Sequence, residues 1–234
     1  MRVFMCFFLK RKFLCLILPG IVSIIVSFTV AVAEQTKELA ISRFDLEGLS
    51  GWSPKIFKGE TQYILIEDDG RRVVQAISHA GASGMVKEID FNPAEYRYLR
   101  WSWKIEDTVA GGDERTKAGD DYAARIYVVF PGRFFWQTRA INYIWANQLP
   151  QGQSIPNPYT ARAMMVAVQS GPSLAGRWLN EERDILSDYK SLFGEEPKEA
   201  GAIAIMTDTD NTGESAVAWY KDIILSTSRR LPNK

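Results

Sequence analysis

Short runs in which apolar and polar side chains alternate constrain the fold of this chain most strongly. In residues 98–105 every second side chain is large and apolar: Leu99, Trp101, Trp103 and Ile105. Successive side chains of a strand point to opposite faces, so this pattern predicts a half-buried strand whose two tryptophans face the core. Similar runs lie at residues 63–67, 72–79, 122–130, 163–169, 201–206 and 216–226. The chain is therefore expected to be mainly β, an antiparallel two-sheet β-sandwich.

Two of these runs are joined by a tight turn. Residues 63–67 and 72–79 flank Asp68-Asp69-Gly70, and an Asp-Gly pair suits the positive φ angles of a short hairpin turn. A β-hairpin is therefore predicted here.

One segment has a helical period instead. Asn180 can cap a helix, Glu181 and Glu182 would lie at its positively polarised end, and Gly194 and Pro197 would stop it. Its apolar side chains share one stripe: Ile185, Leu186, Tyr189, Leu192 and Phe193. A single amphipathic helix over residues 180–193 is expected to flank the sandwich.

The pattern weakens over residues 131–160, where aromatic residues precede Gln, Gly, Pro and Asn. This segment is predicted to be an irregular insertion in one domain that spans residues 34–234. Long loops on a rigid sandwich commonly carry binding residues.

The N-terminus reads as an export signal. A basic cluster at residues 10–12 precedes an apolar run over 13–30, and Ala31-Val32-Ala33 has the small-x-small form that signal peptidase cuts. Residues 1–33 are therefore expected to be a signal peptide cleaved after Ala33, which makes the protein secreted or periplasmic with no transmembrane segment after cleavage. An uncleaved membrane anchor is the alternative.

Composition excludes several classes of activity. Residues 1–33 hold four of the 28 basic residues and no acidic one, so the rest of the chain carries 24 basic against 28 acidic residues. This balance argues against nucleic acid as a partner. Cys6 and Cys15 both lie in the expected signal, and His79 is the one histidine. Thiol chemistry and a histidine-based zinc centre are therefore not expected in the mature chain.

Carboxylates remain as possible catalytic groups. Asp120 and Asp121 stand where a polar loop enters a strand, and Asp208 and Asp210 belong to another loop that could face them. A glycosidase needs two such groups across a cleft, whereas a solvated hairpin loop would explain the first pair equally well. The Asp208–Gly213 segment has the oxygen spacing that begins a calcium loop, but position twelve is Trp219, so a complete EF-hand is ruled out. An Asp-rich turn, or a partial Ca²⁺ site shared with Asp120 or Asp121, remains.

Four motifs resemble a bacterial family known as domain of unknown function 3047. They are Trp101–Lys104, Ala110–Arg125, Met206–Glu214 and Trp219–Ile223. The resemblance runs from about Phe44 to Leu225 and implies no catalytic role, because the family is uncharacterised.

A looser resemblance concerns architecture. Phe44-Asp45, Gly51-Trp52, the Asp-Asp-Gly hairpin, Ser83-Gly84 and a closing Tyr-x-Asp-Ile strand resemble galactose-binding-like jelly rolls used as carbohydrate-binding modules. Such jelly rolls often hold a structural Ca²⁺ between the first and last strands. The resemblance implies Asp45 and Asp222 as its ligands here.

Loop aromatics suggest the ligand. Trp136, Tyr143 and Trp145 of the predicted insertion are candidates to stack on a sugar, with Arg125 and Asn211 to take its hydroxyls. A non-catalytic binding domain for a polysaccharide or another envelope ligand is therefore expected. A carboxylate-dependent hydrolase acting on a glycan and a structural partner in an envelope assembly are the alternatives.

Overall fold

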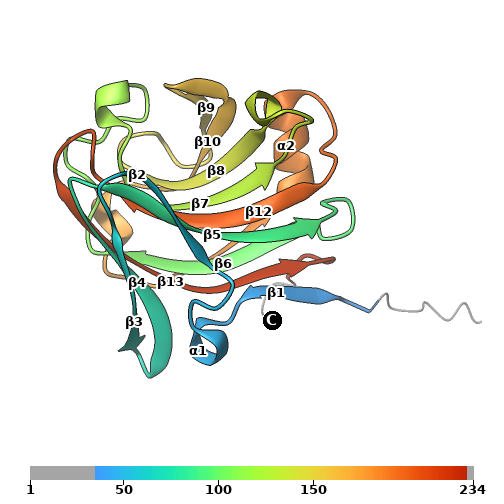
Figure 1. Cartoon of the computed structure of the whole chain (residues 1–234), viewed down its shortest axis with the longest axis horizontal. Coiled ribbons are helices and arrows are strands. Elements are labelled where there is room, and N and C mark those ends of the chain that lie inside the picture. The colour runs from blue at the N-terminus through green and yellow to red at the C-terminus, as the bar shows by residue number, and fades with distance from the viewer. Residues whose placement is uncertain (1–34, 231–234) are drawn as a thin grey trace, which may run out of the picture. The chain divides into compact units, whose positions relative to one another are not determined.

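The computed structural model describes residues 35–230, which form two β-sheets packed face to face (Figure 1). Sheet A contains, in spatial order, β11 (Leu179–Asp184), β6 (Tyr98–Ile105), β13 (Ser215–Ser226), β4 (Arg71–His79) and β3 (Gln62–Asp68), with β1 (Glu38–Ser42) also paired to β13. Sheet B contains β2 (Ser53–Lys58), β5 (Ala82–Phe91), β12 (Ala200–Asp208), β7 (Tyr122–Phe130), β8 (Arg139–Ala146), β10 (Thr160–Ser170) and β9 (Ser154–Asn157). The predicted β-sandwich is confirmed.

The strands follow the alternation of the sequence closely. The strand predicted over residues 122–130 is β7, and the predicted hairpin is β3 and β4. Its turn places Asp69 at φ 51° and Gly70 at φ 69°, two successive positive angles that match the twist of a hairpin.

Aromatic side chains join the two sheets. Trp101 of β6 stacks on Tyr143 of β8 with ring centroids 5.4 Å apart, and Trp103 meets Trp145 at 5.9 Å. All four are at most 1% exposed. Large rings that interdigitate in this way contribute much of the apolar area that a sandwich buries.

The prediction of an irregular insertion over residues 131–160 is wrong, because β8 and β9 lie within it. Tyr143 and Trp145 belong to the core and cannot meet a ligand. The pattern is weak here because β8 is buried on both faces: Ile141 to Ala146 are all buried. A strand covered on both sides shows no alternation. The β8–β10 pair is also parallel, so the sandwich is not purely antiparallel.

The predicted helix is shorter than residues 180–193. Asn180 to Asp184 lie in β11 and pair with β6, and α2 (Ile185–Phe193) begins only after Asp184, whose carboxylate accepts from the Ser187 amide at 3.0 Å. Its C-terminal end is at Gly194, as predicted. A second, four-residue helix, α1 (Phe44–Glu47), follows β1.

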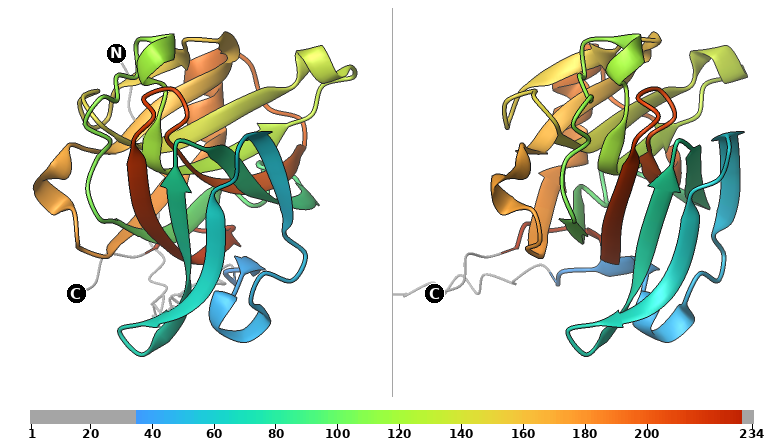
Figure 2. Two further views of the ribbon diagram at one scale, coloured as in Figure 1. Left: turned by 60° about the vertical axis from the view of Figure 1, so that its left-hand side comes forward. Right: turned by 90° about the vertical axis from the view of Figure 1, so that its left-hand side faces the viewer.

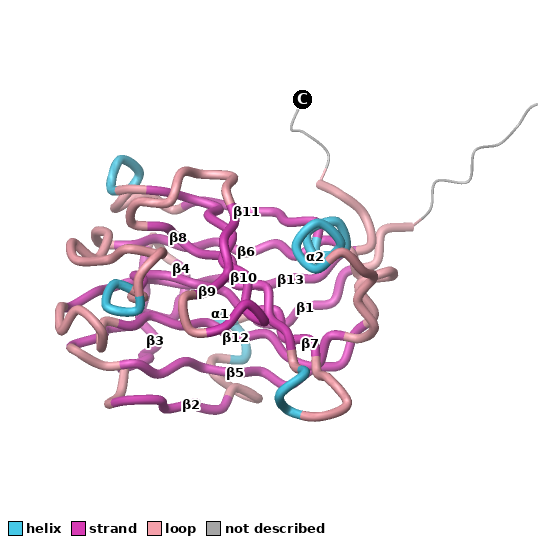
Figure 3. Tube along the Cα trace, turned by 90° about the horizontal axis from the view of Figure 1, so that it is seen from above, coloured by secondary structure: helices cyan, strands magenta, loops and turns pink. Residues whose placement is uncertain are grey.

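Segments beyond the two sheets position the candidate sites. Residues 147–157 cover part of the outer face of sheet B, where Leu149 and Ile155 pack on Ile144 and Met165 in a second small apolar cluster. This segment, which includes the edge strand β9 of sheet B, lies near the top of both views in Figure 2. Helix α2 lies at the opposite end of β7, beside the strand ends (Figure 3). The ring centroids of its Tyr189 and of Phe130 in β7 are 4.5 Å apart.

The expected signal segment, with both cysteines, lies outside the described residues. Among residues 35–230 no helix is long and apolar enough to cross a membrane.

A candidate binding cleft on sheet B

A cleft of about 410 Å³ opens on the outer face of sheet B, a volume typical of small-ligand sites. Its lining comes from β2, β5, β7, β8, β9, β10 and β12, the loop before β7 and the turns after β9 and β12: Phe57, Ala82, Asp120, Arg125, Tyr127, Asn142, Asn157, Tyr159, Ala163, Met206, Asp208, Asp210 and Asn211. We call it the Asp120 cleft.

Side chains from adjacent strands that point to the outer face of sheet B form the floor of the cleft. Ala124, Ile126 and Val128 of β7 enter the main core, so Arg125 and Tyr127 point to the outer face. The register sets Met206 of β12 opposite Arg125 and Asn142 of β8 opposite Tyr127.

A buried ion pair lies beneath the cleft. Arg125 donates to Asp208, and their side chains are 4% and 2% exposed. The rings of Tyr122 and Tyr127 lie 4.6 and 5.6 Å from the guanidinium carbon. Burial opposes the charge on Arg125, but Asp208, Asp120 and the two tyrosines together outweigh burial and raise the pKa of Arg125. The arginine is therefore a permanent cation in a low-dielectric site.

Burial also shifts the pKa values of cleft acids. It raises the pKa of Asp208 well above its usual range; Arg125 opposes this shift, and Asp121, Asp120 and Asp210 add to it. Burial likewise raises the pKa of Tyr127 to about 12, so its phenol stays protonated and can donate a hydrogen bond.

Asp120 ties three segments together. Its carboxylate accepts from Tyr122 Oη at 3.1 Å and from Asn157 Nδ2 at 2.9 and 3.0 Å. Tyr159 Oη in turn donates to Asn211 Oδ1 at 2.8 Å. These bonds hold the loop after β9 against the turn between β12 and β13.

Asp121 fixes that turn from the other side. Its carboxylate accepts from the backbone amides of Asn211 and Thr212 at 3.1 and 2.6 Å. The two Asp-rich segments singled out in the sequence therefore meet in space. Of the predicted site residues, Asp120, Asp208, Asp210, Arg125 and Asn211 all line one cleft.

A carboxylate cluster lies at this junction. Asp121, Asp208 and Asp210 bring ligand oxygens within 4.8 Å of one another, and no other group of three such ligands occurs in residues 35–230. Existing partners already offset part of the charge, because Arg125 pairs with Asp208 and Lys58 lies 3.7 Å from Asp210.

The calcium ligands implied by the jelly-roll resemblance lie elsewhere. Asp45 is exposed on α1, and Asp222 lies 3.6 Å from Arg71. Neither belongs to a cluster of three ligands in the described part of the chain. Calcium at Asp45 and Asp222 stays a prediction from resemblance alone.

Three buried polar atoms of the cleft lack a hydrogen-bond partner. They are Arg125 Nε, Asn142 Oδ1 and Asp208 Oδ1, out of five such side-chain atoms in residues 35–230. Buried polar groups nearly always have a hydrogen-bond partner. This cleft is therefore unusual, because one buried donor and two buried acceptors in it have none.

The sequence analysis missed several lining residues. Tyr127 could have been found, because it shares the outer face of β7 with Arg125 two residues away. Asn142 stands out as a polar residue in an apolar run. Phe57, Asn157 and Tyr159 carry no signal in the sequence, since their place depends on how distant segments fold together.

Trp136 lies apart from these residues. It belongs to a short 3₁₀ turn (Phe135–Gln137) between β7 and β8, at the far end of β7 from Arg125, and it is 55% exposed. The predicted binding residues therefore lie in three places. Arg125 and Asn211 line the cleft, Tyr143 and Trp145 are buried in the core, and Trp136 is exposed at a distance from both.

Residues 50–224 match the family described as protein of unknown function (DUF3047). The chain belongs to this family. The match confirms the resemblance carried by the Trp101, Ala110 and Met206 motifs. No curated protein matches this DUF3047 chain.

Solved structures similar to this DUF3047 protein include carbohydrate-binding modules. The family 30 module of a cellulosomal cellulase from Clostridium thermocellum has TM-score 0.47 and 10% identity, covering 83% of this chain and 99% of the module. A family 29 module from Piromyces equi has TM-score 0.39 and 12% identity, with coverage of 83% and 93%. An endoglucanase from Rhodothermus marinus has TM-score 0.44 and 9% identity, with coverage of 81% and 98%.

Proposed function

We propose that this protein binds a carbohydrate in the Asp120 cleft. The observation that carries the proposal is one cleft that joins the polar side chains of Arg125, Asn142 and Asp208 with exposed aromatic rings. A non-catalytic binding role is the function that this geometry supports best.

Sugar hydroxyls suit this lining. Each hydroxyl can donate one hydrogen bond and accept others, so a sugar fits a cleft that offers both the donors of Arg125 and the acceptors of Asn142 and Asp208. A carboxylate ligand could serve the arginine but would leave both acceptors without partners. Ligands of mixed donor and acceptor character are therefore favoured.

Two aromatic side chains supply an apolar surface beside these polar atoms. Phe57 of β2 and Tyr159 after β9 line the cleft and are 64% and 55% exposed. The apolar face of a pyranose can pack against such rings while its hydroxyls reach the amides and carboxylates.

The proposed location is outside the cytoplasm. The Ala31-Val32-Ala33 cleavage pattern supports export to the periplasm or the medium, where polysaccharides are exposed. Fractionation with N-terminal sequencing of the mature protein tests this: a mature chain beginning at Glu34 is expected, and an intact N-terminus in the membrane fraction would reject cleavage.

A glycan array followed by titration calorimetry tests binding. We expect Tyr159→Ala to weaken a bound oligosaccharide about tenfold, the effect of losing roughly 1.4 kcal/mol of contact. Tyr98→Ala, on the other sheet, is the matched control and should leave affinity unchanged. Titration with and without a chelator reports whether Ca²⁺ contributes. Absence of binding to any glycan would reject the proposal.

One observation favours a second candidate, a hydrolase. Asp208 and Asp210 present carboxylate oxygens within 4.8 Å of each other, and a glycosidase uses two neighbouring carboxylates. A hydrolase would release reducing ends from the bound glycan, and Asp210→Asn should abolish that turnover while retaining affinity. Binding without any turnover would leave the binding role alone.

A further inference from the structure

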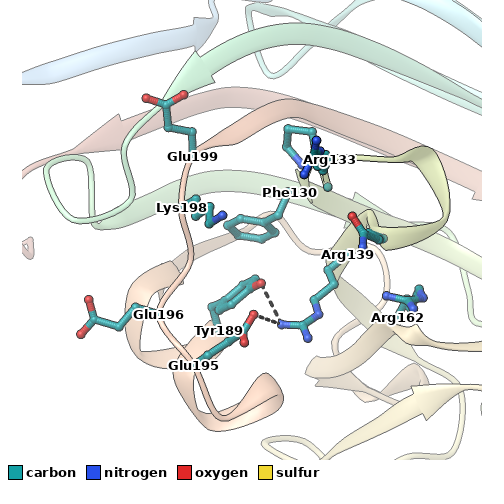
Figure 4. A pocket seen from close by; sticks show the side chains of 12 residues that line it. Phe130, Arg133, Arg139, Arg162, Tyr189, Glu195, Glu196, Lys198 and Glu199 are labelled. Carbon is teal, nitrogen blue, oxygen red and sulfur yellow. Dashed lines mark hydrogen bonds and ion pairs between the residues drawn. The ribbon is translucent and has the colours of Figure 1, made fainter.

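A second pocket, of about 470 Å³, lies at the other end of β7 and β8 (Figure 4). Four cationic side chains line it: Arg133, Arg139, Arg162 and Lys198. Phe130 and Tyr189 form an aromatic wall. We call it the Arg139 pocket.

The strand register places two of the arginines side by side. β8 and β10 run parallel with Ala140 opposite Ala163, so Arg139 and Arg162, one residue earlier on each strand, stand at the same level. Like charges on adjacent strands repel each other. A shared anion would relieve this repulsion.

The carboxylates near the pocket offset the charge of one of its four cations, Arg139. Arg139 Nη1 donates to Tyr189 Oη at 3.1 Å and to Glu195 at 2.5 Å (Figure 4). Glu196 pairs instead with Lys190, outside the pocket lining. Within residues 35–230, Arg133, Arg162 and Lys198 make no ion pair, and Glu199 is the remaining lining acid.

The Arg139 pocket and the Asp120 cleft are neighbours. Arg162 lines the pocket, while the next residue on β10, Ala163, lines the cleft. On β7 the cleft residue Tyr127 is three positions from the pocket residue Phe130, or about 10 Å along a strand. Successive side chains of a strand point to opposite faces, so the pocket and the cleft open on opposite faces of sheet B and each binds its own ligand group.

We propose that the Arg139 pocket binds the acidic group of an anionic polysaccharide. This inference rests on the proposed carbohydrate-binding function and adds the charge of the ligand. A guanidinium offers paired donors that match the two oxygens of a carboxylate or sulfate. Trp136, next to the pocket residue Gln137, can cover the adjoining sugar ring.

Titration with polygalacturonate and with its methyl ester tests the inference, because the ester keeps the chain and removes the charge. We expect the acid to bind at least about tenfold more tightly, with an advantage that shrinks at high salt. Arg162→Gln should remove most of that advantage and leave binding of the ester unchanged. Arg72→Gln, an exposed arginine of β4, gives the same change in net charge and should have no effect.

A second matched pair, dextran and dextran sulfate, separates the two sources of anion. Preference for polygalacturonate alone assigns a carboxylate, and preference for both charged polymers assigns any acidic sugar. Equal binding of charged and neutral polymers would overturn the inference and leave the proposed function standing. Binding of neither member of either pair, with neutral glycans bound on the array, would also overturn it.

Discussion

The Asp120 cleft and the Arg139 pocket lie at the two ends of the same strands, yet they are built differently. The cleft is tied together by buried groups: an ion pair between Arg125 and Asp208, and carboxylates of Asp120 and Asp121 that hold loops in place. Of the four cations that line the pocket, Arg139 alone makes an ion pair within residues 35–230.

Because of this difference, substitutions in the cleft should affect both binding and stability, whereas substitutions around the pocket should affect binding alone. Substitutions in the cleft remove bonds on which the fold also depends, so a loss of binding there requires a control for folding. Substitutions of the exposed arginines and aromatics around the pocket should leave the fold intact. Effects on stability should therefore decrease from the cleft to the pocket, and the following variants test that order.

Asp208→Asn should have the largest effect. It leaves Arg125 charged and buried without a carboxylate, which costs about 3–5 kcal/mol of unfolding free energy. Urea denaturation measures it. Asp210→Asn, whose partner Lys58 is exposed, is the control and should cost less than about 1 kcal/mol. The double variant Asp208→Asn with Arg125→Met should recover part of the loss. A cost below 1 kcal/mol for Asp208→Asn alone would show that the buried pair does not support the fold.

Glu114→Gln should have the next largest effect. Glu114 is fully buried, and its carboxylate accepts from the backbone amides of Asn147 and Leu149, which start the loop over sheet B. Hydrogen bonds to a charged group contribute about 1.5–3 kcal/mol, so a loss in that range is expected by urea denaturation. Glu106→Gln, on an exposed loop, is the control. An equally small change in both variants would mean that Glu114 does not anchor the loop.

The local sequence pattern predicted those strands in which apolar and polar side chains alternate. The β3–β4 hairpin, β7 and the inward-facing Trp101 and Trp103 follow from side chains that take turns between core and solvent. β8 could not be found in this way, because Ile144 on its outer side is covered by Leu149 and Met165. Burial on both faces removes the alternation that identifies a strand.

The candidate site was predictable in its residues but not in its assembly. Asp120, Asp208 and Asn211 were recognisable as polar residues at strand ends. Their meeting depends on β7 pairing with β12, and contacts between residues so far apart in the sequence leave no local signal. Helix α2 shows the same limit: Asp184, not Asn180, caps it because β11 first pairs with β6.

Asp184→Ala should have a smaller effect on stability. Asp184 caps α2, the helix whose Tyr189 lines the Arg139 pocket. Burial opposes ionisation of Asp184, but hydrogen bonds from Arg97 and Ser187 outweigh it and hold its pKa below the usual 3.8. A lowered pKa gives stability that is present above pH 3.8 and is lost as the pH falls through the folded value. Losing this cap should cost about 1 kcal/mol at pH 7.

Thermal unfolding of wild type and Asp184→Ala at a series of pH values measures this contribution. The difference between the two proteins should shrink below pH 3.8, whereas Glu106→Ala should show no such convergence. A difference that stays constant down to pH 2 would mean that the capping bonds do not depend on ionised Asp184.

Trp136→Ala should change stability least, because its ring is 55% exposed and touches only Phe134 and Phe135 of the same turn among the aromatic rings of residues 35–230. A change within about 0.5 kcal/mol is expected for a surface side chain of this kind. Binding should respond instead: the affinity for polygalacturonate should fall severalfold, and the affinity for a neutral oligosaccharide held in the Asp120 cleft should not. Phe57→Ala, at the cleft, is the reciprocal control and should weaken the neutral oligosaccharide alone. If Trp136→Ala lowers the unfolding free energy as much as Glu114→Gln, the turn supports the fold. The expected decrease in stability effects from the cleft to the pocket would then be wrong.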